Sequence, residues 1–159
     1  MQKILLSLII ASSCIVAEGA FSLGHKNFSF GLTQNGEYTV IGANAHYMVM
    51  DDLSVGLGIT TWVGDKPSIT KFSVPVTYYI PMESVVRPYV GFFISHTFMG
   101  NDGVIEYSDY NSFGARGGVV VDVAPNMYAY AGWVQVKHSG DNLIDDSDGY
   151  PEFGIGASF

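Results

Sequence analysis

The last ten residues, Tyr150-Pro-Glu-Phe-Gly-Ile-Gly-Ala-Ser-Phe159, decide the fold of this 159-residue chain. Phe153, Ile155, Ala157 and Phe159 share one parity, and small or polar residues take the other. Successive side chains of a strand point to opposite faces, so this alternation predicts a β-strand with one apolar face. Termini of water-soluble proteins tend to fray into solvent. A final Phe on an apolar stripe therefore indicates a strand in apolar surroundings.

The same alternation recurs along the chain and predicts eight strands. Most of them are about ten to thirteen residues long, whereas strands of soluble proteins usually have about five or six. The predicted length suits a tilted strand that crosses a bilayer. Pro75 lies inside one strand and cannot donate to a strand ladder, which predicts a bulge or a local gap there. The predicted strands cover about 28–33, 37–50, 53–63, 71–80, 87–98, 113–122, 127–139 and 150–159.

The connections between the predicted strands alternate in length. The turns at Asp51, Pro81 and Ala124 are short, and the connections between them are longer. Short turns at one end and longer loops at the other are typical of outer-membrane β-barrels. An even number of strands then places both ends of the barrel domain on the short-turn side.

Charged residues favour the parity that also carries glycine and polar residues. A soluble barrel or sandwich, the alternative fold, would show Lys, Glu and Asp on its exterior. Inward charges need partners because burying an unpaired charge is costly. We therefore predict a packed lumen without an open pore, in which Tyr89 joins a network of inward charges. The predicted network consists of Lys71, Arg87, Arg116, Asp122, Lys137 and Glu152.

Composition narrows the classes of function. The net charge is −8 with only 7 Lys and Arg, so the chain has no basic patch for nucleic acid. Charged residues make up 14%, well below the quarter or so of soluble domains. Beyond the N-terminal segment no apolar run approaches the length of a membrane helix. If the chain spans a membrane, it does so with strands.

Residues 1–20 are predicted to be a cleaved signal peptide, and residues 21–159 the barrel domain. Lys3 supplies a positive start, the apolar run begins at Ile4, and small residues from Ala17 to Ala20 permit cleavage. Cys14, the only cysteine, is an alternative lipoprotein acylation site, although the usual Leu three residues before it is missing.

Two strand segments carry a family resemblance. Arg87-Pro-Tyr-Val-Gly-Phe92 and Gly154-Ile-Gly-Ala-Ser-Phe159 resemble strand segments of the small OmpA-like and OmpX-like barrels of Gram-negative bacteria. The resemblance implies an all-β, eight-stranded antiparallel up-and-down transmembrane β-barrel in the cell outer membrane. It also implies that the barrel-assembly machinery reads the closing strand through Phe153, Ile155, Ala157 and Phe159.

The expected function is structural or interactional, for a monomer without a cofactor that contacts outer-membrane lipid, lipopolysaccharide and surface partners. A narrow conduit for small solutes is one alternative. Another is a lipid A acyl hydrolase, because some small barrels carry a His-x-Ser pair followed by a Glu, and His138, Ser139 and Glu152 resemble it. Here His138 and Ser139 are adjacent, so they are expected on opposite faces of the strand. Glu152 has the parity that faces the lumen. His138 shares the parity of Val134 and Val136, which is expected to face lipid. A divalent-cation site at Asp145, Asp146 and Asp148 is a weaker possibility.

Overall fold

The computed structural model describes residues 20–35, 38–64, 69–100, 109–139 and 147–159, and these residues form the eight predicted strands. Most strands alternate in burial with the parity that the sequence predicts, and β7 is the exception. The strands are β1 Lys26–Asn35, β2 Tyr38–Met50, β3 Leu53–Val63, β4 Ile69–Tyr79, β5 Val86–Met99, β6 Tyr110–Ala124, β7 Met127–Ser139 and β8 Ser147–Ser158.

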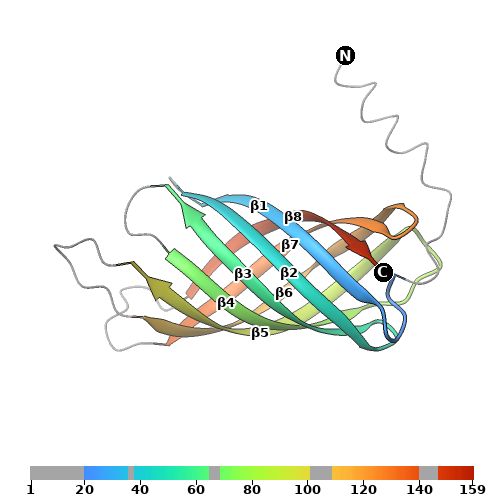
Figure 1. The fold of residues 1–159 in the computed structure, drawn as a ribbon, viewed down its shortest axis with the longest axis horizontal. Helices are drawn as coiled ribbons and strands as arrows, with labels where there is room; N and C mark the ends of the chain where they lie inside the picture. The colour runs from blue at the N-terminus through green and yellow to red at the C-terminus, as the bar shows by residue number, and fades with distance from the viewer. Residues whose placement is uncertain (1–19, 36–37, 65–68, 101–108, 140–146) are drawn as a thin grey trace, which may run out of the picture.

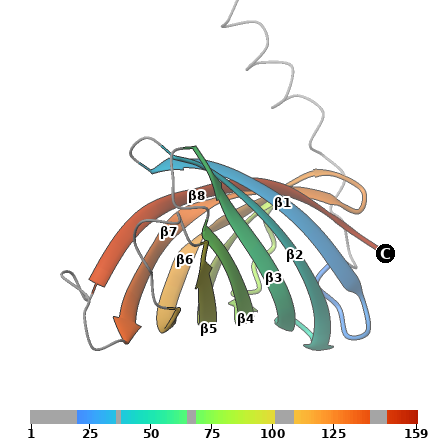
Figure 2. The same cartoon turned by 60° about the vertical axis from the view of Figure 1, so that its left-hand side comes forward.

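The eight strands close into an antiparallel barrel in which each strand pairs with the next along the chain (Figures 1 and 2). The closing contact joins β1 to β8 over a short register, from Asn27↔Ser158 to Gly31↔Gly154. The C-terminus lies at the end of the barrel that carries the short turns (Figure 1). The predicted eight-stranded up-and-down barrel is therefore confirmed. Within the described residues, no helix is long and apolar enough to cross a membrane.

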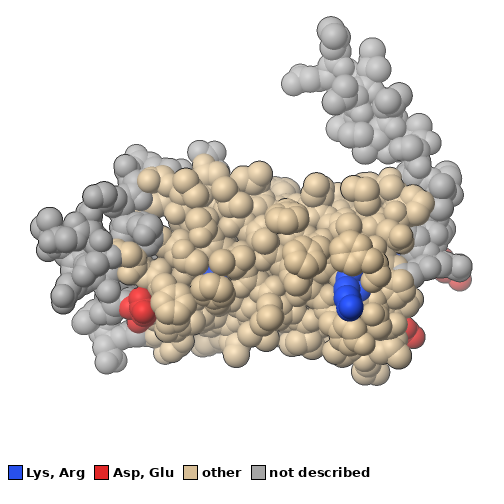
Figure 3. Space-filling model, viewed as in Figure 1, with Lys and Arg blue, Asp and Glu red and all other residues tan. Residues whose placement is uncertain are grey.

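The outer face of the barrel is apolar. Leu57, Phe92 and Ile94 are each more than 60% exposed, and they point away from the lumen. Between the two ends, the face seen in Figure 3 is almost entirely uncharged. A water-soluble barrel would not leave so large an apolar surface open to solvent, whereas a hydrocarbon environment matches it. The outer face therefore has the chemistry of a transmembrane barrel.

The predicted irregularity at Pro75 is a local gap. The β3–β4 ladder runs from Leu53↔Tyr78 to Val55↔Val76 and resumes at Gly58↔Ser73. The register is the same on both sides of the interruption, so no residue is inserted. The ladder is interrupted because Pro75 has no N–H to donate.

Glycines on the inner face leave room for aromatic side chains in the lumen. A Cβ at Gly132 would collide with the hydroxyl of Tyr89, and one at Gly156 would collide with the ring of Tyr128. Both tyrosines are almost fully buried. Small residues on some strands thus allow long side chains from others to fill the barrel, as expected for eight strands.

Residues just before β1 enter the short-turn end of the lumen. Phe21 is only 3% exposed, and its ring centroid lies 4.3 Å from that of Tyr79. Its carbonyl accepts a hydrogen bond from the Asp52 N–H at 2.8 Å. Phe21 therefore acts as an apolar plug at this end of the barrel.

Candidate functional site in the barrel lumen

An ion pair with an added hydrogen bond crosses the middle of the lumen. Arg116 Nε on β6 lies 3.4 Å from Glu152 Oε1 on β8. The hydroxyl of Tyr89 on β5 donates to the same oxygen at 2.6 Å, and the Arg116 guanidinium lies over the Tyr89 ring. Three strands thus supply one compact group of charged and polar side chains, which fills the lumen at this level.

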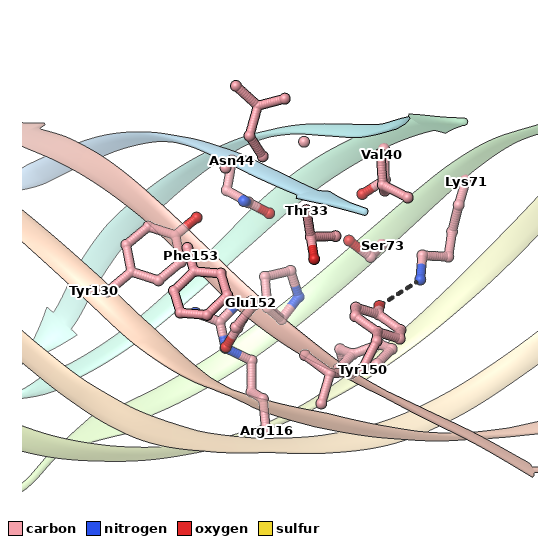
Figure 4. A pocket seen from close by; sticks show the side chains of 17 residues that line it. Thr33, Val40, Asn44, Lys71, Ser73, Arg116, Tyr130, Tyr150, Glu152 and Phe153 are labelled. Atoms are coloured by element: carbon pink, nitrogen blue, oxygen red, sulfur yellow. Dashed lines mark hydrogen bonds and ion pairs between the residues drawn. The ribbon is translucent and has the colours of Figure 1, made fainter. Parts of the chain in front are cut away.

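A second group lies closer to the loop end and centres on Lys71. Its Nζ donates a 3.1 Å hydrogen bond to the Tyr150 hydroxyl (Figure 4). The ammonium also lies between 5.1 and 5.6 Å from the ring centroids of Trp62, Phe93 and Tyr150, within cation–π range. Lys71 is only 7% exposed, so aromatic faces supply most of its surroundings.

Two small cavities flank this lysine. One, of about 80 Å³, extends toward Arg116 and Glu152 and is lined by Asn44, Thr60 and Ser73, among others. The other, of about 90 Å³, extends toward the loop end and is lined in part by Tyr110 and His138. Lys71 and Tyr150 line both cavities, as do Thr33 and Val40.

A third group of charges lies at the short-turn end. Arg87 approaches Asp52 at 3.8 Å and Asp122 at 3.9 Å, and its guanidinium lies over the Phe21 ring. Partial burial raises the pKa of the Asp52 carboxyl above its ordinary value, the Arg87 charge opposes that shift, and Asp51 adds to it. Arg87 thus links the turn after β2 to the end of β6.

The inner face holds Lys71, Arg87, Arg116, Asp122 and Glu152. The prediction for Lys137 is wrong, because this side chain is exposed on the outer face. On β7 the lumen receives Val134 and Val136, which are nearly fully buried. Their apolar character suggested a lipid-facing parity, but the packed lumen itself requires apolar side chains at this level.

The three residues of the hydrolase alternative do not meet. Ser139 is exposed, Glu152 is engaged by Arg116 and Tyr89, and His138 faces the lumen rather than the lipid parity expected for it. His138 Nδ1 instead shares a 2.8 Å hydrogen bond with Ser112 Oγ. Ser112 is 4% exposed, so it is not positioned to attack a lipid.

The acidic segment that could hold a divalent cation lies only partly within the described residues. Asp145 and Asp146 lie outside the described residues, and Asp148 Oδ1 accepts the Gly149 N–H at 2.7 Å. In the described part of the chain, no three His, Cys, Asp or Glu side chains are grouped closely enough to hold a metal ion.

Several lumen residues were missed by sequence reasoning, and three of them are next to the charged groups. Tyr150 and Trp62 surround Lys71, and Phe21 plugs the short-turn end. The parity of Tyr150, shared with Glu152, was an available signal. Phe21 precedes the first strand, and no periodic pattern includes it.

The fold matches solved barrels. The structure superimposes on the N-terminal β-barrel domain of Pseudomonas aeruginosa OprF with a TM-score of 0.63 and 20% identity, covering 87% of this chain and 98% of that one. For Neisserial surface protein A the TM-score is 0.57 and the identity 17%, with coverages of 84% and 93%. For Ail of Yersinia pestis they are 0.56 and 16%, with coverages of 86% and 99%.

These neighbours are eight-stranded outer-membrane barrels, and Ail has also been studied in phospholipid bilayer nanodiscs. At these identities the shared property is the fold. No protein-family model matches the chain, and no curated protein matches it in sequence. The fold that the chain shares with them is the closed eight-stranded antiparallel β-barrel.

Proposed function

We propose that this chain is a barrel of the Gram-negative outer membrane with a closed lumen, and that it acts through its lipid contacts and surface loops. The observation that carries the proposal is the separation of chemistry across the barrel wall. Apolar side chains cover the outside, while the charges turned inward form three groups, two of them ion-paired. Such a wall suits a membrane protein whose interior is not a wide channel.

The proposed topology places the short turns and Phe159 in the periplasm and the longer connections at the cell surface. Residues 1–20 are then a leader for export, cut near Ala17 to Ala20. The barrel-assembly machinery reads the closing strand, and lipopolysaccharide surrounds the outer half of a monomeric barrel. N-terminal sequencing of the protein from outer membranes tests the leader, and an uncut N-terminus would reject it.

The location is tested by fractionation and heat-modifiable migration. We expect the protein in the outer-membrane fraction, with the unheated barrel running as a compact species that shifts after boiling. Recovery from the soluble periplasm would reject the membrane proposal. Size-exclusion chromatography in detergent with light scattering tests the monomer.

The conduit alternative is tested separately by planar-bilayer recording. Arg116–Glu152–Tyr89 fills the lumen at one level and Phe21 with Tyr79 fills it at another, so we expect no stable conductance steps. Reproducible steps from the purified barrel would favour the conduit. Unchanged lipid A acylation in cells that express the protein would exclude the hydrolase.

A further inference from the structure

Lys71 is the one inward cation of the described lumen that no described carboxylate approaches within ion-pair distance. Arg87 faces Asp52 and Asp122, and Arg116 faces Glu152. The polar contact of Lys71 is with the neutral hydroxyl of Tyr150. An ammonium has three donors, and within the described residues only the Tyr150 hydroxyl accepts from this one.

Among the described residues, two carboxylates, Glu152 and Asp148, act on the Lys71 ammonium from beyond ion-pair distance. Glu152 is already paired with Arg116, at 3.4 Å. Asp148 lines the cavity at the loop end, but its side chain is exposed and bonded to the Gly149 N–H. Burying an ammonium with no carboxylate in contact is costly, which favours an anion next to Lys71.

We propose that Lys71 holds a small inorganic monovalent anion, of the size of chloride, in the cavity between Lys71 and Arg116. The polar side chains of Asn44, Thr60 and Ser73 line this cavity and offer further donors (Figure 4). Asn44 and Ser73 converge above Gly58, where a Cβ would collide with both. The missing side chain at Gly58 thus leaves room for the polar atoms of Asn44 and Ser73.

The dimensions restrict the ligand class. A cavity of about 80 Å³ has room for an ion and one or two waters, since a water occupies about 30 Å³ of liquid. Organic ligands normally need pockets of about 300 Å³ or more. The rings of Trp62, Phe93 and Tyr150 restrict access around the ammonium. The site therefore fits a halide and excludes a metabolite.

Trp62 is a built-in reporter of this site, because its ring centroid is 5.1 Å from Lys71 Nζ. The chain has two tryptophans, and Trp133 lies on the outer face. In a Trp133→Phe background, the folded barrel is titrated with sodium iodide while sodium gluconate keeps the ionic strength constant. Iodide bound at Lys71 should quench Trp62 fluorescence saturably at millimolar concentration, and chloride should compete.

The matched variants are Lys71→Met and Lys137→Met, one lysine inside the barrel and one outside. We expect Lys71→Met to weaken saturable quenching by about tenfold or more and Lys137→Met to leave it unchanged. Linear, chloride-insensitive quenching that persists in Lys71→Met would overturn the proposal and indicate a site that holds water only. If Lys71→Met does not fold, chloride competition in the protein with Lys71 intact decides. None of these readouts depends on membrane location or on a surface role.

Discussion

The Tyr89 hydroxyl donates a 2.6 Å hydrogen bond to Glu152 Oε1, and this bond joins β5 to β8 across the lumen. These two strands do not pair in the barrel wall. The same carboxylate oxygen lies 3.4 Å from Arg116 Nε on β6. Glu152 is therefore an internal brace that connects strands on different sides of the cylinder.

Glu152→Gln should destabilise the barrel strongly. The substitution leaves the Arg116 guanidinium buried opposite a neutral amide, and breaking a buried pair from one side typically costs about 3–5 kcal/mol. The free energy of unfolding in urea, measured in detergent or lipid vesicles, gives the loss directly. Glu83→Gln is the matched control, because Glu83 is exposed in the turn between β4 and β5.

The double variant Arg116→Met with Glu152→Gln distinguishes the cost of an unpaired Arg116 charge from the cost of altered packing. It should recover much of the stability that Glu152→Gln loses, since no unpaired guanidinium remains. Losses that simply add in the double variant would contradict an energetic coupling between Arg116 and Glu152.

Gly132→Ala should destabilise the barrel, whereas Gly42→Ala should not. A methyl group at Gly132 meets the Tyr89 hydroxyl and the Gly117 carbonyl, while at Gly42 the nearest atom is Thr60 Oγ1 at 3.6 Å. Overpacking typically costs about 1–3 kcal/mol. Replacing an uncrowded glycine in a strand is neutral or stabilises by up to about 1 kcal/mol. Urea unfolding of the two variants checks the difference, and equal effects would refute the close packing inferred around Tyr89.

Phe159→Ala should impair assembly without lowering the stability of barrels that have formed. The Phe159 backbone exchanges two 3.0 Å hydrogen bonds with Lys26, but its side chain is 68% exposed. The heat-modifiable fraction in outer membranes should fall, while urea unfolding of the purified, folded variant stays near the parent. Phe28→Ala, also on the outer face, is the control. Normal assembly of Phe159→Ala would argue against a closing-strand signal.

Asp52→Asn should change how stability depends on pH. Partial burial raises the pKa of Asp52, so the folded state binds its proton up to a higher pH than the unfolded state does. Stability of the parent should therefore fall as the pH rises through the window between the ordinary value of about 4 and the raised one. Asn at this position tolerates the left-handed φ of 61°.

Unfolding of the two proteins from pH 3 to pH 7 tests this prediction. The variant should gain stability relative to the parent as the pH rises through the window. A relative gain for the parent would mean that attraction between Arg87 and Asp52 outweighs the cost of burial.

The strands and the closed architecture could be predicted because alternation is local and repeats along the chain. The interruption at Pro75 was predictable for the same reason, since it follows from one missing N–H. The direction in which the β7 side chains point was not predictable, because both faces of this strand carry apolar side chains. Ala131 and Trp133 point outward, while Val134 and Val136 point inward. Pairing with β6 and β8, rather than hydropathy, sets that direction and places Lys137 outside.

The contacts between side chains inside the lumen could not be predicted from local sequence patterns. Lys71 and Tyr150 are 79 residues apart, and their hydrogen bond depends on the cross-section of the finished barrel. Parity can place a side chain inside, but it does not indicate which inward neighbours meet. The partnership of Glu152 with Arg116 follows from charge; the aromatic surroundings of Lys71 do not.

The short register between β1 and β8 imposes an order on folding. Beyond Gly31↔Gly154 the two strands are linked through a side chain, because the Thr33 hydroxyl donates to the Pro151 carbonyl at 2.9 Å. Every other strand pair joins neighbours along the chain, but this one joins its two ends, at the largest cost in loop-closure entropy. The β1–β8 pairing should therefore form last in assembly. Its backbone amide hydrogens should exchange with solvent before those of the other strand pairs, so the barrel opens first along this seam.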